Sequence, residues 1–348
     1  MAHKHTKTLI LAASFLLTAV LPSGAAKQTA RAASLTLLHA VETGNLTVAR
    51  AALAAGAAPN ARSENNMTAL LIASRRSDAP VMNALLDAGA DANAKGPGNY
   101  TALRILPNKV DISLIRLLLD RGAKRPLLAR YATRPDVLRL LLSRGANVNA
   151  QAPDGSTALM VASAFDWNMA VVEFLLNQGA DIHAKDNTGA TALTYAAYGR
   201  RSIPLMQFLL DKGADVSTIN VERFSRRTPL TEAALENSTA RMSFLLAHGA
   251  DIHAVDLQTV ILMSNPYFDK SIRFLLDRGA DVNSRDPSGG TPLMEAAQWS
   301  QEARVKMLLS YKADVNVKNK AGETALSLAQ KWHQDEIAAL LEAAGAKE

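Results

Sequence analysis

The chain has 348 residues, no cysteine, few aromatic residues and a formal net charge of +6. The absence of cysteine excludes disulfides, thiolate metal sites, cysteine nucleophiles and thiol redox chemistry. The excess of positive charge is small and spread along the sequence, so we expect no nucleic-acid partner.

The first 26 residues are organised like a secretory signal peptide. Lys4 and Lys7 precede an uncharged apolar run over residues 9–21, and small residues follow it. A basic start, a short apolar run and a small-residue site predict cleavage after Ala25 or Ala26. The run is short for a membrane span, and an uncleaved anchor is the alternative. Cleavage would remove the two lysines and lower the formal net charge to +4. We expect residues 27–33 to form a linker between the signal peptide and the rest of the chain.

Export and the absence of disulfides together favour a bacterial envelope protein that resides in the periplasm. Secretion into the medium is the alternative, because the same kind of signal directs both. No other segment is long and apolar enough for a membrane span, so none is expected in the mature chain.

From residue 34 onward one sequence frame recurs with a period near 33 residues. A clear copy reads Thr191-Ala192-Leu193, then Ala196-Ala197, then Leu209-Leu210, then Gly213-Ala214-Asp215. A fixed period of this length is typical of stacked-repeat proteins. The following residues occupy the glycine position of the successive copies: Gly56, Gly89, Gly122, Gly145, Gly179, Gly213, Gly249, Gly279, Lys312 and Gly345.

Each copy predicts two short helices. The leading threonine, as in Thr228-Pro229, is a preferred N-cap, and the proline suits the first helical position. The glycine after the leucine pair predicts a helix end in the left-handed conformation. Helices this short are marginal alone in water, so neighbouring copies must supply their packing surface.

The frame resembles the ankyrin repeat, most closely in Asp286–Leu293 with Ala296-Ala297, and in Gly279–Asn283 and Gly89–Asn93. The resemblance covers residues 34–348. It implies an all-α ankyrin-repeat solenoid of about ten stacked helix-turn-helix units with short hairpin fingers. The buried histidine of the family pattern is absent from every copy, which removes an expected source of hydrogen bonds between repeats.

Several copies depart from the period. The terminal copies, 34–60 and 324–345, are atypical and are interpreted as caps. Only 23 residues separate Gly122 from Gly145, so a hairpin and part of a first helix are missing, and Arg125–Leu128 is expected to start a helix directly. This short copy is either a binding notch or a decayed repeat. Another short copy contains Asn265-Pro266, which tightens the joint between its two helices.

No motif indicates catalysis. The sequence contains no H-E-x-x-H, G-x-S-x-G or P-loop pattern. His183 and His253 hold the same place in copies two repeats apart, on the order of 20 Å at typical helix spacing, which is too far to share a metal. We therefore expect no catalytic residue, no cofactor, no metal and no enzyme activity. A hydrolase activity would need a further, non-repeat domain.

The resemblance implies a non-catalytic scaffold that binds a partner protein at its hairpin tips and at the exposed ends of its first helices. The tips, in order, are Arg62, Lys95, Gln151, Lys185, Ile219, Val255, Arg285 and Lys318. Most are basic, which favours an acidic partner. A further basic stretch, Arg223–Arg227, is expected to be a solvated loop.

Aromatic and basic residues are also expected at the ends of the first helices, and exposed aromatic side chains are frequent binding hot spots. Trp332, in the terminal copy, is instead expected to pack on a loop between helices. The predicted partner-binding set is Arg62, Arg75, Arg76, Lys95, Tyr100, Phe165, Lys185, Tyr198, Arg285, Trp299 and Lys318. A purely structural spacer is the competing hypothesis.

Overall fold

A computed structural model describes residues 23–124, 128–165, 169–198, 203–222, 225–255, 257–263 and 269–347. The apolar run of the predicted signal peptide, the start of the helix predicted at Arg125 and the Asn265-Pro266 joint lie outside these ranges. Within them the chain forms short helices and one small antiparallel hairpin, β1 (Asn220–Glu222) with β2 (Ser225–Arg227). The predicted all-α helix-turn-helix architecture is confirmed.

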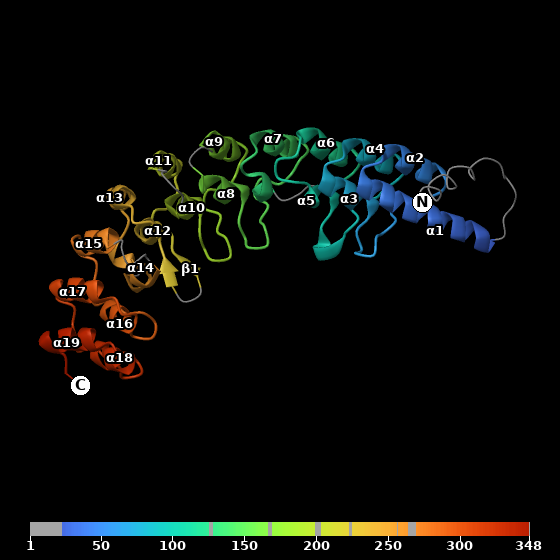
Figure 1. Cartoon of the computed structure of the whole chain (residues 1–348). Helices are drawn as coiled ribbons and strands as arrows, with labels where there is room; N and C mark the ends of the chain where they lie inside the picture. The colour runs from blue at the N-terminus through green and yellow to red at the C-terminus, as the bar shows by residue number, and fades with distance from the viewer. Residues whose placement is uncertain are drawn as a thin grey trace, which may run out of the picture. The chain divides into compact units, whose positions relative to one another are not determined.

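The chain forms two compact units, Met1–Pro126 (unit 1) and Leu127–Glu348 (unit 2). The boundary lies in the short copy between Gly122 and Gly145. In each unit a first helix alternates with a second helix along the chain, and the loop before each first helix is called a finger (Figure 1).

In unit 1 the first helices are α1 (Ser23–Thr43), α3 (Ala69–Arg76) and α5 (Ala102–Ile105), the second helices are α2 (Leu46–Ala54), α4 (Ala79–Asp87) and α6 (Ile112–Asp120), and a 3-10 turn, η1 (Pro97–Asn99), lies in a finger. In unit 2 the first-helix places hold η2 (Leu128–Tyr131), α8 (Ala158–Ser163), α10 (Ala192–Tyr198), α12 (Pro229–Leu235), α14 (Leu257–Met263), α16 (Pro292–Gln298) and α18 (Ala325–Lys331). The second helices of unit 2 are α7 (Pro135–Ser143), α9 (Met169–Asn177), α11 (Ile203–Asp211), α13 (Thr239–Ala247), α15 (Lys270–Leu276), α17 (Glu302–Ser310) and α19 (Asp335–Ala343), and a 3-10 turn, η4 (Ile252–Ala254), follows α13.

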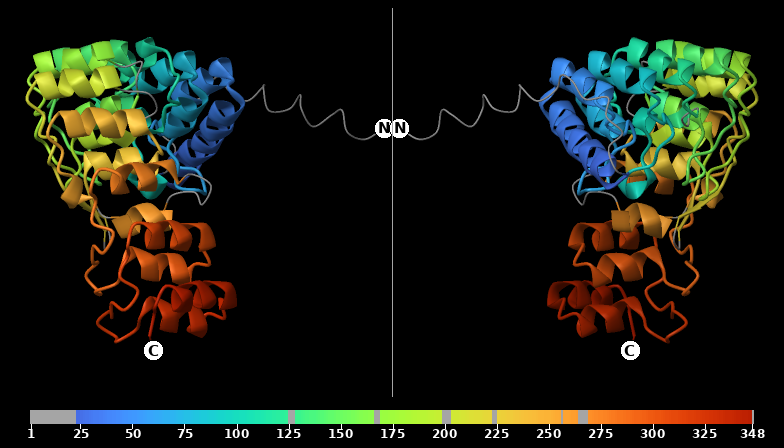
Figure 2. Two further views of the ribbon diagram at one scale, coloured as in Figure 1. Left: turned by 90° about the vertical axis from the view of Figure 1, so that its left-hand side faces the viewer. Right: turned by 90° about the vertical axis from the view of Figure 1, so that its right-hand side faces the viewer.

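Within each unit the helices form two layers. First helices pack on the first helices of neighbouring repeats, as α10 does on α8 and α12, and second helices pack on second helices, as α13 does on α15. Figure 2 shows α16–α19 stacked in this way, with their fingers on one side of the stack. The leucines of the repeat frame fill the space between the layers: Leu193, Leu209 and Leu245 are fully buried.

The predicted helix ends are confirmed. Thr228 Oγ1 accepts a hydrogen bond from the Thr231 main-chain N–H at 3.2 Å, which caps the start of α12. All nine glycines at the end of the frame have φ between 76° and 94°, the left-handed region. Lys312 adopts the same conformation, with φ of 64°.

Residues 27–33, predicted as a linker, lie within the continuous helix α1. Their sequence is rich in alanine and contains neither glycine nor proline, so helix propensity extends α1 through them.

The short copy also differs from its prediction in the part that the structure describes. In place of an α-helix beginning at Arg125–Leu128, a 3-10 turn runs from Leu128 to Tyr131. Leu128 and Tyr131 are fully buried in it. Two large side chains on one tight turn thus supply the core contribution that a first helix makes elsewhere.

Asparagine side chains connect adjacent fingers, although the family histidine is missing. Asn93 donates to the Gly122 carbonyl at 2.8 Å and accepts from the Lys124 N–H at 2.7 Å. Asn149 makes the equivalent pair of bonds to Gly179 and Asp181 in unit 2. These hydrogen bonds from uncharged side chains satisfy main-chain N–H and C=O groups just after a second helix. They also align one finger with the next.

Candidate partner-binding surface

Aromatic side chains at the ends of first helices in unit 2 are exposed. Tyr198 is the last residue of α10 and is 58% exposed, and Trp299, the C-cap of α16, is 56% exposed. Phe165 follows α8 and is 41% exposed. The Trp299 indole N–H donates to Glu295 Oε2 at 3.1 Å, which holds the ring in one orientation. These side chains present apolar area on ordered elements.

Trp332 holds the same place in α18 that Trp299 holds in α16, and it is 52% exposed. The prediction that its ring packs on a loop between helices stays a prediction. A C-cap residue at this place projects beyond the last helical turn, and more than half of the tryptophan surface stays in solvent in both repeats.

In unit 1 the predicted residues lie in two environments. Arg75 and Arg76 are exposed in the last turn of α3, where positive charge is favourable, and they border a cavity of about 260 Å³ with Glu42 and Ser63. Tyr100 is partly exposed, and the guanidinium carbon of Arg104 lies 4.8 Å from the centre of its ring. That face of Tyr100 is thus covered by a cation from its own chain.

The finger tips are not equivalent. Arg62 Nη1 donates to the Lys95 carbonyl at 2.9 Å, Gln151 Nε2 to the Lys185 carbonyl at 3.0 Å, and Arg285 Nη1 to the Lys318 carbonyl at 3.5 Å. In these pairs the first tip uses its side chain to bind the main chain of the next. The three lysines at the receiving tips are exposed, so their side chains can meet a partner. By contrast, Val255 is buried and Ile219 is half-buried.

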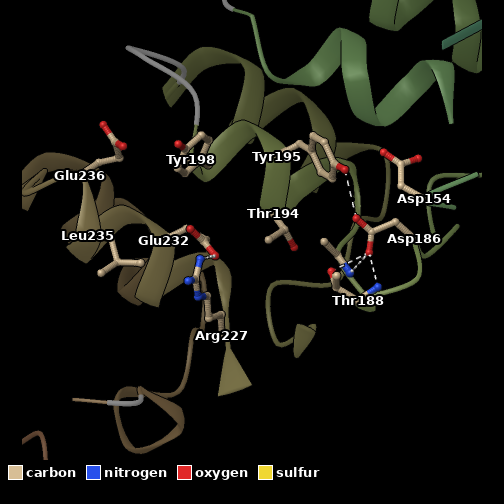
Figure 3. Close-up of a pocket in the computed structure, with 11 residues that line it drawn as sticks. Asp154, Asp186, Thr188, Thr194, Tyr195, Tyr198, Arg227, Glu232, Leu235 and Glu236 are labelled. Carbon is tan, nitrogen blue, oxygen red and sulfur yellow. Dashed lines mark hydrogen bonds and ion pairs between the residues drawn. The ribbon is translucent and has the colours of Figure 1, made fainter. Parts of the chain in front are cut away.

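Unit 2 contains a pocket of about 630 Å³ between fingers and first helices (Figure 3). Asp154 and Asp186 line it from two successive fingers, and Tyr195 and Tyr198 from α10. Arg227 at the end of β2, Glu232 in α12 and Glu236 beyond it form the opposite wall. We call these residues the acidic pocket, because it holds four carboxylates and one guanidinium.

The Asp186 carboxylate of the acidic pocket is held by several hydrogen bonds. Its Oδ1 accepts bonds from the Thr188 N–H at 2.8 Å and the Ala190 N–H at 3.0 Å, and its Oδ2 accepts from the Tyr195 hydroxyl at 3.0 Å. Burial, followed by the nearby Asp186 charge, raises the pKa of Tyr195 well above its usual range, so the phenol stays a neutral donor.

The other charged groups of the acidic pocket are also held in place. Hydrogen bonds from Ser156 lower the pKa of Asp154 below its ordinary value, so that carboxylate is ionised at neutral pH. Arg227 Nη1 lies 3.4 Å from Glu232 Oε1, and both side chains are nearly buried. The prediction of a solvated basic loop is therefore wrong at Arg227, whereas Arg223 and Phe224 lie outside the described residues.

Comparison with known proteins shows which family this architecture belongs to. The family model for ankyrin repeats in three copies matches residues 127–220 and 260–347, and that for a single ankyrin repeat matches residues 65–97 and 225–257. The chain belongs to the ankyrin repeat family. No curated protein matches it. It is similar in fold to the crystal structure of the human ASB11 ankyrin repeat domain, with a TM-score of 0.51, 24% identity, and coverage of 64% of this chain and 100% of that chain.

Ankyrin repeats are protein-interaction modules, so the repeats of this chain indicate a protein-binding scaffold. Among the described residues no helix has the length and apolar character needed to cross a membrane. Over the same residues no cluster of three or more histidine, aspartate or glutamate side chains is arranged to hold a metal ion.

The ankyrin frame predicts where the tips and helix ends lie, but it does not predict the acidic pocket. Asp154 and Asp186 lie in consecutive fingers but at different places in the frame, three residues before Thr157 and five before Thr191, so the repetition itself gives no signal for the pocket. Glu232, Glu236 and Arg227 come from the next repeat. Only the stacking of ankyrin units shows that these three face the two aspartates.

Proposed function

We propose that the protein is a non-catalytic scaffold that binds a partner protein through its fingers and first helices. The observation that supports this most is the exposure of Phe165, Tyr198 and Trp299 at the ends of first helices of unit 2. Rigid aromatic side chains of this kind give large contact area and lose little conformational entropy on binding.

The exposed fingertip lysines, Lys95, Lys185 and Lys318, favour partner segments that carry acidic side chains opposite the tips. Arg62 and Arg285 contribute mainly by bonding the next tip, since each donates to a neighbouring main-chain carbonyl. We expect the lysines to affect the rate of association and its salt dependence more than the lifetime of the complex.

We propose further that the protein is exported and acts in the bacterial periplasm as an adaptor, inhibitor or protective partner of an envelope protein. Cleavage after Ala25 or Ala26 would remove only the first turn of α1 and leave the repeats intact. A secreted effector that binds host proteins is the alternative. Fractionation of the producing cells, with mass spectrometry of the mature N-terminus, distinguishes periplasm from medium and tests cleavage.

Affinity capture from the envelope fraction tests the binding function. The first variant is Trp299→Ala combined with Phe165→Ala, and the second changes Lys95, Lys185 and Lys318 to glutamate. A matched control changes Arg116, Lys270 and Lys306, exposed cations on second helices, to glutamate. We expect the aromatic variant to capture about tenfold less partner than wild type, because it has lost hot-spot residues.

The lysine variant should lose capture at low salt more than at high salt, and the control should match wild type. Equal capture by all forms would contradict a role for this surface. Capture that fails equally with the control would show a general charge effect instead. A purely structural spacer predicts no change in any variant.

A further inference from the structure

The acidic pocket has a charge opposite to that of the molecule around it. The chain has a formal charge of +6, and three of the finger tips are exposed lysines. Within unit 2, however, Asp154, Asp186, Glu232 and Glu236 face a single guanidinium, that of Arg227. A cation entering this pocket is attracted locally, whereas an acidic group is attracted to the tips.

An aromatic wall accompanies the carboxylates. Tyr195 and Tyr198 lie on α10, and Figure 3 shows Tyr195 beside Asp186 and Tyr198 on the side toward Glu236 and Glu232. Tyr195 is fixed by its bond to Asp186, while 58% of the Tyr198 surface is exposed to solvent. An exposed aromatic face beside carboxylates stabilises a cation through the ring quadrupole as well as through charge.

The chain already places a guanidinium in this environment. Arg227 reaches Glu232 at the base of the pocket, with both side chains nearly buried. The remaining volume, about 630 Å³, is larger than one side chain and is sufficient for a side chain together with part of the segment that carries it. The size and lining fit a projecting side chain of a protein better than a small inorganic ion.

We propose that the acidic pocket binds an arginine side chain of the partner protein. This inference rests on the proposed scaffold function and specifies the group that the scaffold recognises. Arginine fits better than lysine because its planar guanidinium stacks on a tyrosine ring and donates in parallel to carboxylate oxygens. Tyr198 provides the ring, and Asp154 and Glu236 provide exposed carboxylates at the rim. Arginine flanked by acidic residues would satisfy both the pocket and Lys185 at the adjoining tip.

The test uses the full mature chain and a random peptide library displayed on phage. Recovered peptides are synthesised with a fluorescent label, together with versions in which arginine is replaced by lysine or by citrulline, its neutral isostere. Binding is measured by fluorescence anisotropy. We expect arginine at one position of the recovered peptides, and affinity about tenfold weaker with citrulline, because charge-assisted hydrogen bonds are lost.

Pocket variants locate the interaction. Tyr198→Ala should weaken the arginine peptide about fivefold, the size of a partly desolvated cation–aromatic contact. Glu236→Gln and Asp154→Asn keep side-chain shape and remove one charge each, and each should weaken it severalfold. Control variants are Glu302→Gln and Lys306→Gln, exposed residues of α17 outside the pocket, which should bind the peptide like wild type.

Several outcomes would overturn the inference. One is the recovery of peptides without arginine, and another is a peptide that binds the pocket variants and wild type equally. A third is that spermidine displaces the labelled arginine peptide as strongly as arginine amide does. Loss of peptide binding in Trp299→Ala, but not in Tyr198→Ala, would overturn the pocket assignment while leaving the scaffold function intact. The envelope capture experiment tests the scaffold function separately.

Discussion

Lys312 occupies the position at the end of the repeat frame where the other copies have glycine. It has φ of 64°, in the left-handed region that glycine occupies in the other copies. A side chain in this conformation costs about 1 kcal/mol relative to glycine, so we expect Lys312→Gly to raise the free energy of unfolding by about that amount. Urea denaturation measures the change.

The control for this substitution is Lys306→Gly, in the interior of α17. There the same chemical change should lower the free energy of unfolding by about 1 kcal/mol, because glycine is unfavourable inside helices. Two changes of the same sign would show that composition, and not backbone conformation, decides the effect.

Arg304 is a charged residue that serves the core. It is 1% exposed, its Nε lies 2.9 Å from Asp269 Oδ1, and its Nη1 donates to the main-chain carbonyl of Ile261. Arg304→Met should lower the free energy of unfolding by about 3 kcal/mol, because it leaves Asp269 without its cation and the carbonyl without its donor.

Lys306 provides the matched comparison for Arg304, since its pair with Glu302 lies on the surface of the same helix. Lys306→Met should change the free energy of unfolding by less than about 1 kcal/mol. A similar loss at both positions would indicate that burial does not set the strength of the Arg304 interactions.

At the scale of elements, adjacent fingers are in close main-chain contact at Gly155. The Asn187 N–H donates to the Asp154 carbonyl at 3.0 Å, and a Cβ at Gly155 would lie 2.5 Å from the same nitrogen. Gly155→Ala should therefore separate the two fingers that carry Asp154 and Asp186. We expect it to lower stability and to weaken arginine-peptide binding by severalfold.

Gly179→Ala controls for backbone strain. Gly179 has nearly the same positive φ as Gly155, but no atom lies within 4 Å of a Cβ there. Left-handed strain alone should cost about 1–2 kcal/mol in both variants, with a further loss only at Gly155. Equal denaturation midpoints for the two variants would contradict a close contact between the fingers.

Elements with local signals were predictable from the sequence. A capping threonine followed by small and apolar residues predicts the first helix α16, and a leucine pair followed by glycine predicts the end of the second helix α11, in both cases without reference to the rest of the chain. The 3-10 turn at Leu128–Tyr131 was not predictable in the same way, because only the packing of neighbouring repeats decides how a shortened copy fills its place. The extension of α1 through residues 27–33 lies outside the repeat frame, which begins at residue 34, and it follows from the helix propensity of the alanines there.

At the scale of the whole molecule, the positive net charge does not indicate that one pocket carries mainly negative charge. The basic finger tips predict an acidic partner, and the tip lysines Lys95, Lys185 and Lys318 are exposed. The acidic pocket forms because two fingers and the following repeat bring carboxylates together from separate places in the sequence. The local charge therefore depends on the stacking of repeats as much as on composition, which is why the repeat frame locates the tips and helix ends but does not predict the pocket.

Division into two compact units predicts that the chain does not unfold in one step. Each unit has its own buried core, with Leu85 of α4 fully buried in unit 1 and Leu245 of α13 fully buried in unit 2. In repeat proteins stability is nearly a sum of neighbouring terms, and cooperativity fails where coupling is weak. Replacing either leucine with alanine should cost about 3 kcal/mol, confined to its own unit.

Hydrogen exchange with mass spectrometry measures this confinement directly. In Leu85→Ala, peptides from residues 46–120 should exchange faster while those from residues 229–343 keep wild-type rates, and in Leu245→Ala the pattern should reverse. The two substitutions are of the same kind at equally buried positions, so each controls for the other. Faster exchange throughout the chain in either variant would show that the two units unfold as one cooperative body, contrary to the prediction.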